Sequence, residues 1–149
     1  MILAVPVVGT LFSLPAWAQS TELNAAYKKY HTLDKQGKYT EAIPFAQQFI
    51  LLVKKEFGGN HQYFALGLHN LATLYTDLGR YAAAEPLWKR ALAISEKALG
   101  SEHPDVAQRL INLATVYRAQ GHYAAAEPLY KRALAIYEKA LGPEHPSVA

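Results

Sequence analysis

The chain has 149 residues, of which 51% are hydrophobic and 18% are charged, and its formal net charge is +3. This length and balance suffice for one domain with a buried core, and they exclude a disordered polar tract. The sequence contains no cysteine, which excludes a disulfide framework and thiolate chemistry.

Residues 1–18 predict an export signal. They carry no charge, are apolar nearly throughout and end on AWA, a small-x-small pattern that a signal peptidase accepts. We therefore expect cleavage between Ala18 and Gln19 and a periplasmic or extracellular location. The basic residue that usually opens such a signal is missing, so an alternative is a membrane anchor formed by residues 2–18. Two prolines and fewer than about 20 apolar residues make that span a poor one.

The rest of the chain repeats with a period of 42 residues. Residues 61–102 and 103–144 are identical at 28 of 42 positions, and residues 19–60 follow the same frame more loosely. Residues 145–149 (HPSVA) copy the start of the preceding unit (HPDVA), so they begin a further, truncated repeat. A period of about 20 to 50 residues is typical of stacked repeats.

Each unit contains two amphipathic helix patterns. In the middle unit, apolar residues recur at helical spacing over residues 68–78 and again over residues 84–99. Gly79 lies between the two patterns and Gly100 follows the second, where a residue with positive φ can end a helix. A pair of helices cannot bury such stripes alone, so the units are expected to stack.

Residues 19–60 diverge from the other units. Lys29 and Tyr30 stand where the middle unit has Leu71 and Ala72, and the segment is rich in lysine. A repeat array needs an atypical terminal unit that faces water. We interpret residues 19–60 as an N-terminal capping unit.

The segments NLATLYTDLGRYAAAEPLWKRALAI and NLATVYRAQGHYAAAEPLYKRALAI resemble tetratricopeptide repeats (TPRs). The 42-residue period and the EPLYKRALAI run are most similar to the kinesin-light-chain-like subclass. The resemblance is strong over residues 61–149 and moderate over residues 19–60. It implies an all-α fold, an α-α superhelix or TPR solenoid of stacked antiparallel helix pairs, in which the first helices line a concave wall.

Helical spacing places polar side chains on the non-core side of the first helices, where we expect a protein or peptide to bind. Asn70 and Asn112 are the main candidates, because a carboxamide both donates and accepts hydrogen bonds. The resemblance implies that asparagine at this place faces the groove. An equally weighted alternative is that the two asparagines tie helices together. The weaker candidates are His69, Thr73, Asp77, Thr115 and Arg118, for which an ordinary solvated face is the simpler interpretation.

Other chemistry finds little support in the sequence. His61, His103 and His145 recur once per repeat, but two helices separate them, so their rings stand too far apart to share a metal ion. Capping or loop roles are expected instead. No glycine-rich phosphate loop, HExxH or GxSxG motif occurs, and no basic stripe with interleaved aromatics suggests nucleic acid. We expect no catalytic residue, no metal and no cofactor.

The sequence therefore predicts a non-catalytic protein–protein interaction scaffold that binds a peptide or protein segment on its concave face. One alternative is an accessory arm of a larger enzyme or signalling protein, with the catalytic domain beyond Ala149. A second is a self-associating structural module, because the apolar face of residues 126–141 is left uncovered and can pair in a homo-oligomer. No stable membrane insertion is expected after signal cleavage.

Overall fold

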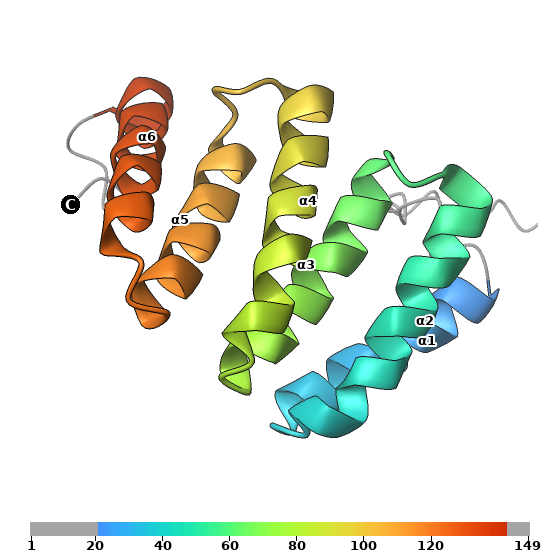
Figure 1. Ribbon diagram of the computed structural model, residues 1–149. Helices are drawn as coiled ribbons and strands as arrows, with labels where there is room; N and C mark the ends of the chain where they lie inside the picture. The colour runs from blue at the N-terminus through green and yellow to red at the C-terminus, as the bar shows by residue number, and fades with distance from the viewer. Residues whose placement is uncertain (1–20, 143–149) are drawn as a thin grey trace, which may run out of the picture.

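The computed structural model describes residues 21–142, which form six α-helices and no strand (Figure 1). The helices are α1 (Thr21–Lys35), α2 (Tyr39–Phe57), α3 (Gln62–Asp77), α4 (Tyr81–Leu99), α5 (Pro104–Ala119) and α6 (Tyr123–Leu141). The predicted signal or anchor (residues 1–18) and the predicted truncated repeat (residues 145–149) lie outside the described residues.

The six helices form three antiparallel pairs in regular succession. Each helix packs on the next one along the chain, both within a pair and between pairs. Figure 1 is seen from the side of the second helices, with α2 in front of α1 and α4 in front of α3. The predicted all-α superhelix of stacked helix pairs is therefore confirmed.

The core continues from one pair into the next. Ala72, Ala84 and Trp88 of the middle pair form one buried cluster with Leu113 and Val116 of the third pair. The two alanines are fully buried, and their small side chains let the helices approach while the indole fills the remaining space. Neighbouring units thus share a core, which is what a stacked array requires.

The first two pairs approach each other closely at Gly67, on α3. A Cβ atom at this position would lie 2.7 Å from Ile50 Cγ1 and 3.2 Å from Phe49 Cδ1, both on α2. Phe49 is itself fully buried and has little room to shift, whereas Ile50 is half-buried. Glycine is used here for its lack of a side chain.

The first helix of each pair ends on a glycine turn. Gly79 has φ +70°, its N–H donates to the Thr76 carbonyl at 2.9 Å, and the N–H of Arg80 donates to the Tyr75 carbonyl at 2.7 Å. This is the Schellman pattern, which satisfies the last carbonyls of the helix. The same pair of bonds recurs at Gly37 and Gly121, and the predicted role of Gly79 is confirmed.

The recurring histidines cap the first helices. The Nδ1 atom of His61 accepts a hydrogen bond from the Tyr63 N–H at 3.2 Å, and that of His103 accepts one from the Asp105 N–H at 3.1 Å. Each ring therefore satisfies one of the free amide groups at a helix N-terminus. The predicted capping role is confirmed for these two residues, whereas His145 lies outside the described part of the chain.

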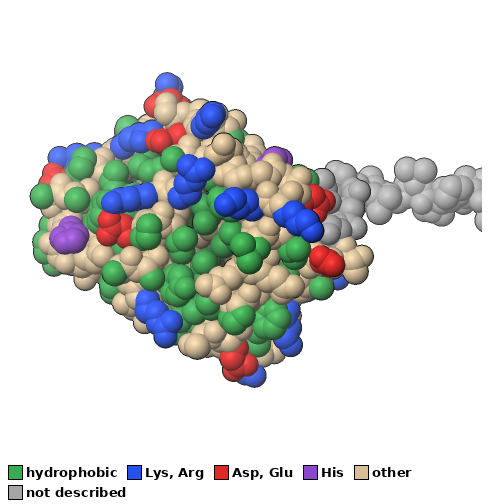
Figure 2. Space-filling model, turned by 45° about the vertical axis from the view of Figure 1, so that its right-hand side comes forward, with side chains coloured by type: hydrophobic (Ala, Val, Ile, Leu, Met, Phe, Trp, Pro, Cys, Tyr) green, Lys and Arg blue, Asp and Glu red, His purple; other side chains and the backbone are tan. Residues whose placement is uncertain are grey.

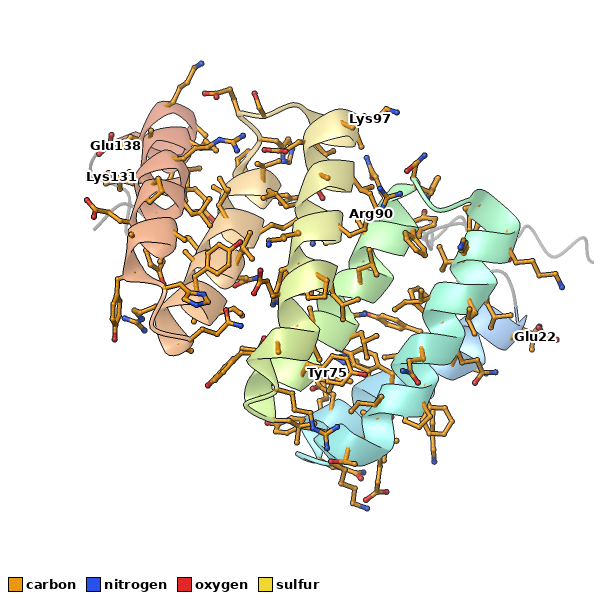
Figure 3. All side chains as sticks on the ribbon, in the orientation of Figure 1. Glu22, Tyr75, Arg90, Lys97, Lys131 and Glu138 are labelled. Atoms are coloured by element: carbon orange, nitrogen blue, oxygen red, sulfur yellow. The ribbon has the colours of Figure 1, made fainter. Side chains whose placement is uncertain are left out.

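An arginine on the second helix fixes each pair to the one before it. Arg90 Nη2 donates to the Gly59 carbonyl at 3.2 Å and to Asn60 Oδ1 at 2.9 Å, and Figure 3 shows it directed at the loop between α2 and α3. One repeat later, Arg132 donates to the Ser101 carbonyl and pairs with Glu96 at 2.7 Å. These repeated bonds hold the register between pairs.

The helices α4 and α6 differ in sequence at only two positions, yet their exposures differ. Leu92 on α4 is half-buried and packs against clusters that include α5, whereas the equivalent Leu134 on α6 is 41% exposed. Tyr123 and Leu141 are also exposed. Figure 3 shows Lys131 and Glu138 pointing away from the rest of the stack. The face that α5 covers on α4 is therefore open on α6.

Candidate functional site

A groove of about 450 Å³ opens between α3 and α5, with α4 at its back. Four residues of α3, one of α4 and three of α5 line it. They are His69, Thr73, Thr76, Asp77, Trp88, Gln108, Asn112 and Thr115. Because α3 and α5 are first helices of successive units, the groove lies where helical spacing predicted the binding face.

Five of the seven predicted site residues come together in this groove. His69, Thr73 and Asp77 lie along α3, and Asn112 and Thr115 face them from α5. Asn70 and Arg118 do not line it. Trp88 also lines the groove. Helical spacing did not indicate this role, because Trp88 lies in the apolar stripe of α4 and so was expected only in the core.

Asn70 and Asn112 occupy equivalent positions but different environments. Asn70 is only 8% exposed, and its Nδ2 atom is buried with no hydrogen-bond partner. Asn112 is half-buried, and its Oδ1 accepts a hydrogen bond from Gln108 Nε2 at 3.2 Å. The physical reason is position in the stack: α3 has a helix pair on either side, whereas α5 belongs to the last described pair. The expectation that both asparagines face the groove therefore holds for Asn112 only.

The side chain of His69, on α3, lies between Trp88 of α4 and Arg109 of α5. Its ring meets that of Trp88 edge-on, with centroids 4.9 Å apart, and its Nδ1 is 3.3 Å from Arg109 Nη1. Burial, reinforced by the nearby Arg109 charge, lowers the pKa of His69 to about 4. His69 is therefore a neutral imidazole at physiological pH, and its Nδ1 accepts from the guanidinium.

The groove threonines bond to their own helices. The hydroxyls of Thr73, Thr76 and Thr115 donate to the carbonyls four residues earlier, at 3.0, 2.8 and 2.9 Å. Thr76 Oγ1 also accepts from Trp88 Nε1 at 3.3 Å, and Thr115 Oγ1 lies 3.0 Å from the Tyr130 hydroxyl. These bonds fix the rotamers of the three threonines and the position of the indole, so the groove is pre-organised on both the α3 and the α5 side.

Asp77 marks the end of the groove nearest α1. Burial, followed by the charge of Asp34 on α1, raises the pKa of the Asp77 carboxyl above its usual value. Within residues 21–142, neither carboxylate forms an ion pair with a Lys, Arg or His. This end of the groove therefore carries negative charge without a cation beside it.

Arg118 lies in a separate hollow of about 310 Å³. That hollow is also lined by Tyr123, Ala126, Glu127, Tyr130 and Lys131, and so lies on the open face of α6. Arg118 occupies the position that Thr76 holds one repeat earlier. A groove residue of the middle unit thus has an equivalent at the edge of the last described unit.

Residues 21–142 contain neither a metal-binding cluster nor a membrane-spanning helix. No three His, Cys, Asp or Glu side chains gather there as metal ligands would. Among the helices of this range, none combines the length and hydropathy that a membrane crossing needs.

Paired helices stacked around a concave groove define a class of helical repeat protein. The model of the tetratricopeptide repeat family matches residues 63–139, just over half of the chain. The chain belongs to the tetratricopeptide repeat family. Repeats of this family generally act as non-catalytic scaffolds that bind proteins or peptides.

Solved structures support the same relationship. Two crystal structures of nearly identical TPR-like repeats from Podosopora anserina, assigned to a kinesin light chain, each match with a TM-score of 0.76 and 27% identity. Both matches cover 91% of this chain. They cover 63% and 62% of the two matched chains, so this chain spans less than two thirds of the length of those proteins. The predicted kinesin-light-chain-like relationship is confirmed.

A third structure is a more distant match. BtubC (BKLC) from P. vanneervenii matches with a TM-score of 0.56 and 18% identity, covering 91% of this chain and 62% of its own, and so shares the fold. No curated protein sequence matches the chain.

Proposed function

We propose that the protein is an interaction scaffold that binds an extended peptide or protein segment in the groove between α3 and α5. The observation that carries this proposal is the groove itself, a pre-organised concave site into which polar side chains of two successive units converge. Its partly apolar wall and few fixed polar groups are typical of a ligand site. Asn112 would contact the ligand backbone, and Asn70 would support the fold.

A random peptide library displayed on phage tests the proposal. Peptides selected on the protein are retested against Gln108→Trp, which places a bulky side chain at the mouth of the groove on an exposed position of α5. The matched control is Gln47→Trp, on an exposed position of α2 outside the groove. We expect only Gln108→Trp to abolish binding, with helicity unchanged by circular dichroism. Equal binding by the two variants would refute the proposal that the peptide binds in the groove.

The open face of α6 favours a second candidate function, self-association. Tyr123 is 67% exposed, and Leu134 and Leu141 are each 41% exposed. The residues equivalent to Tyr123 and Leu134 on α4, Tyr81 and Leu92, pack in clusters that include α5. Two copies in contact here would remove these side chains from water. Light scattering across a concentration series tests this candidate, and a constant monomer mass at high concentration would reject it.

We also propose export for this protein, on the strength of the AWA pattern that ends residues 1–18. Expression in a bacterial host followed by N-terminal sequencing of the mature protein tests it. A mature chain that begins at Gln19 supports export with cleavage, and an intact Met1 retained in the membrane fraction supports the anchor instead.

A further inference from the structure

The polar atoms that face the groove are mainly hydrogen-bond acceptors. The hydroxyl protons of Thr73 and Thr76 are committed to helix carbonyls, which leaves their oxygens free to accept only. The Trp88 N–H is already used by Thr76. The neutral His69, whose Nδ1 accepts from Arg109, keeps one N–H donor at Nε2, so a ligand that lies against the α3 wall meets mostly acceptors.

The α5 wall has the same tendency. One Nε2 proton of Gln108 is used by Asn112, while Gln108 Oε1 accepts from the Tyr137 hydroxyl at 3.3 Å. The Asn112 carboxamide keeps its Nδ2 donor for a ligand. Across the groove, donors are thus fewer than acceptors.

The charge in the groove has one sign. No Lys or Arg lines it, His69 is neutral, and Asp77 is its single charged side chain at physiological pH. Asp34 adds a second negative charge from α1, and neither acid has an ion-pair partner within the described residues. The chain as a whole is nevertheless positive, at +3.

The basic side chains lie mainly elsewhere. Lys89, Lys131 and Lys139 are engaged with Glu85, Glu127 and Glu102 on exposed surfaces. Figure 2 shows Lys and Arg side chains spread over an outer face, around a central area of hydrophobic side chains. The negative charge of the groove is therefore opposite in sign to the net charge of the chain, and such local differences orient charged partners.

We propose, as a refinement that rests on the proposed function, that the groove recognises a segment bearing a lysine or arginine, whose charged group lies against Asp77 and Asp34. An ammonium or guanidinium group brings only donors, which complements the threonine oxygens as well as the two carboxylates. The cavity, the acceptor-rich wall and the unpaired acids agree on this one ligand chemistry.

A neighbouring hollow of about 150 Å³ is the main competitor for a charged ligand. It contains the half-buried Arg109, whose Nε has no hydrogen-bond partner, and this cation favours an anionic ligand. Asp105 lines the same hollow and offsets part of the charge. Arg109 does not line the larger groove, which is why we assign the cationic preference to the larger site.

The test starts from the phage selection described above. Peptides that lose binding to Gln108→Trp are taken as groove binders and sequenced. We expect lysine and arginine to be enriched in them relative to the starting library. Groove binders without a charge preference, or enriched in aspartate and glutamate, would overturn the inference and leave the groove function standing. A selection that yields no groove binders would overturn both.

A double-mutant cycle then assigns the contact. One selected peptide and its Lys→Gln version are titrated against the wild type and Asp77→Asn by fluorescence anisotropy. We expect Asp77→Asn to weaken the lysine peptide about fivefold and to leave the glutamine peptide unchanged, as for a largely exposed charge pair. Glu56→Gln, an exposed acid on α2, is the control and should change neither. Equal effects of Asp77→Asn on both peptides would overturn the assignment.

Discussion

At the scale of single residues, His69 makes the fold sensitive to pH. Its pKa is lowered from the ordinary 6.5 to about 4, because burial against Trp88 and the nearby Arg109 both oppose a charged ring. Between pH 6.5 and 4 the unfolded chain therefore binds a proton that the folded chain does not. The stability that His69 contributes is complete above pH 6.5 and is lost as the pH falls through this window.

We expect the free energy of unfolding to fall by on the order of 3 kcal/mol from pH 7 to pH 4 through this residue alone. Urea titrations at intervals of pH measure the change. His69→Gln keeps a polar side chain without a titratable ring and should flatten the curve between pH 6.5 and 4. A curve of the same slope in both proteins would show that other groups cause the acid sensitivity.

Gly67 sets the distance between the first two pairs. Alanine normally stabilises a helix relative to glycine, but here the added methyl group would lie 2.7 Å from Ile50 Cγ1. We expect Gly67→Ala to destabilise the protein by about 1–3 kcal/mol, the usual cost of overpacking. Thermal melts of Gly67→Ala, Ile50→Ala and the double variant check this, because the second substitution should relieve part of the cost of the first. Strictly additive effects would contradict the close contact.

At the scale of elements, the histidine caps can be separated from the other histidines. His103 precedes α5 and caps it through Nδ1, whereas His122 precedes α6 and makes no side-chain capping bond. We expect His103→Ala to cost about 1 kcal/mol, His103→Asn to restore most of the loss, and His122→Ala to have little effect. Chemical denaturation measures all three. Equal losses for the two alanine variants would argue against capping.

The helices themselves were predictable because their signals are local. Apolar spacing and the glycine turns at Gly79 and Gly121 depend only on residues a few positions apart, and the structure confirms them. The candidate site was only partly predictable. Asn70 and Asn112 lie in the same local sequence, NLAT, so nothing near them indicates which one a neighbouring pair buries. Trp88 likewise serves both the core and the groove, a double role that spacing alone does not reveal.

At the scale of the whole molecule, position in the stack decides what a residue contributes. Leu92 and Leu134 lie in the same local sequence, LAI preceded by KRA, but Leu92 packs against the following pair and Leu134 is 41% exposed. We expect Leu92→Ala to cost about 2–3 kcal/mol and Leu134→Ala less than about 1 kcal/mol. Calorimetric melts of the two variants at low concentration give the comparison. Equal losses would mean that the face of α6 is covered in solution.

The narrow approach at Gly67 also constrains the order in which the three units can follow one another. One repeat later, alanine (Ala91) stands at the position of the bulky Phe49, and arginine (Arg109) stands at the position of Gly67. At the first junction the large side chain is on the second helix, and at the next junction it is on the following first helix. A shuffled gene that places the third unit directly after the first would set Arg109 against Phe49. Although the units look interchangeable, the first junction requires a residue without a side chain opposite Phe49 and Ile50, so the third unit could not take the place of the second without further substitutions there.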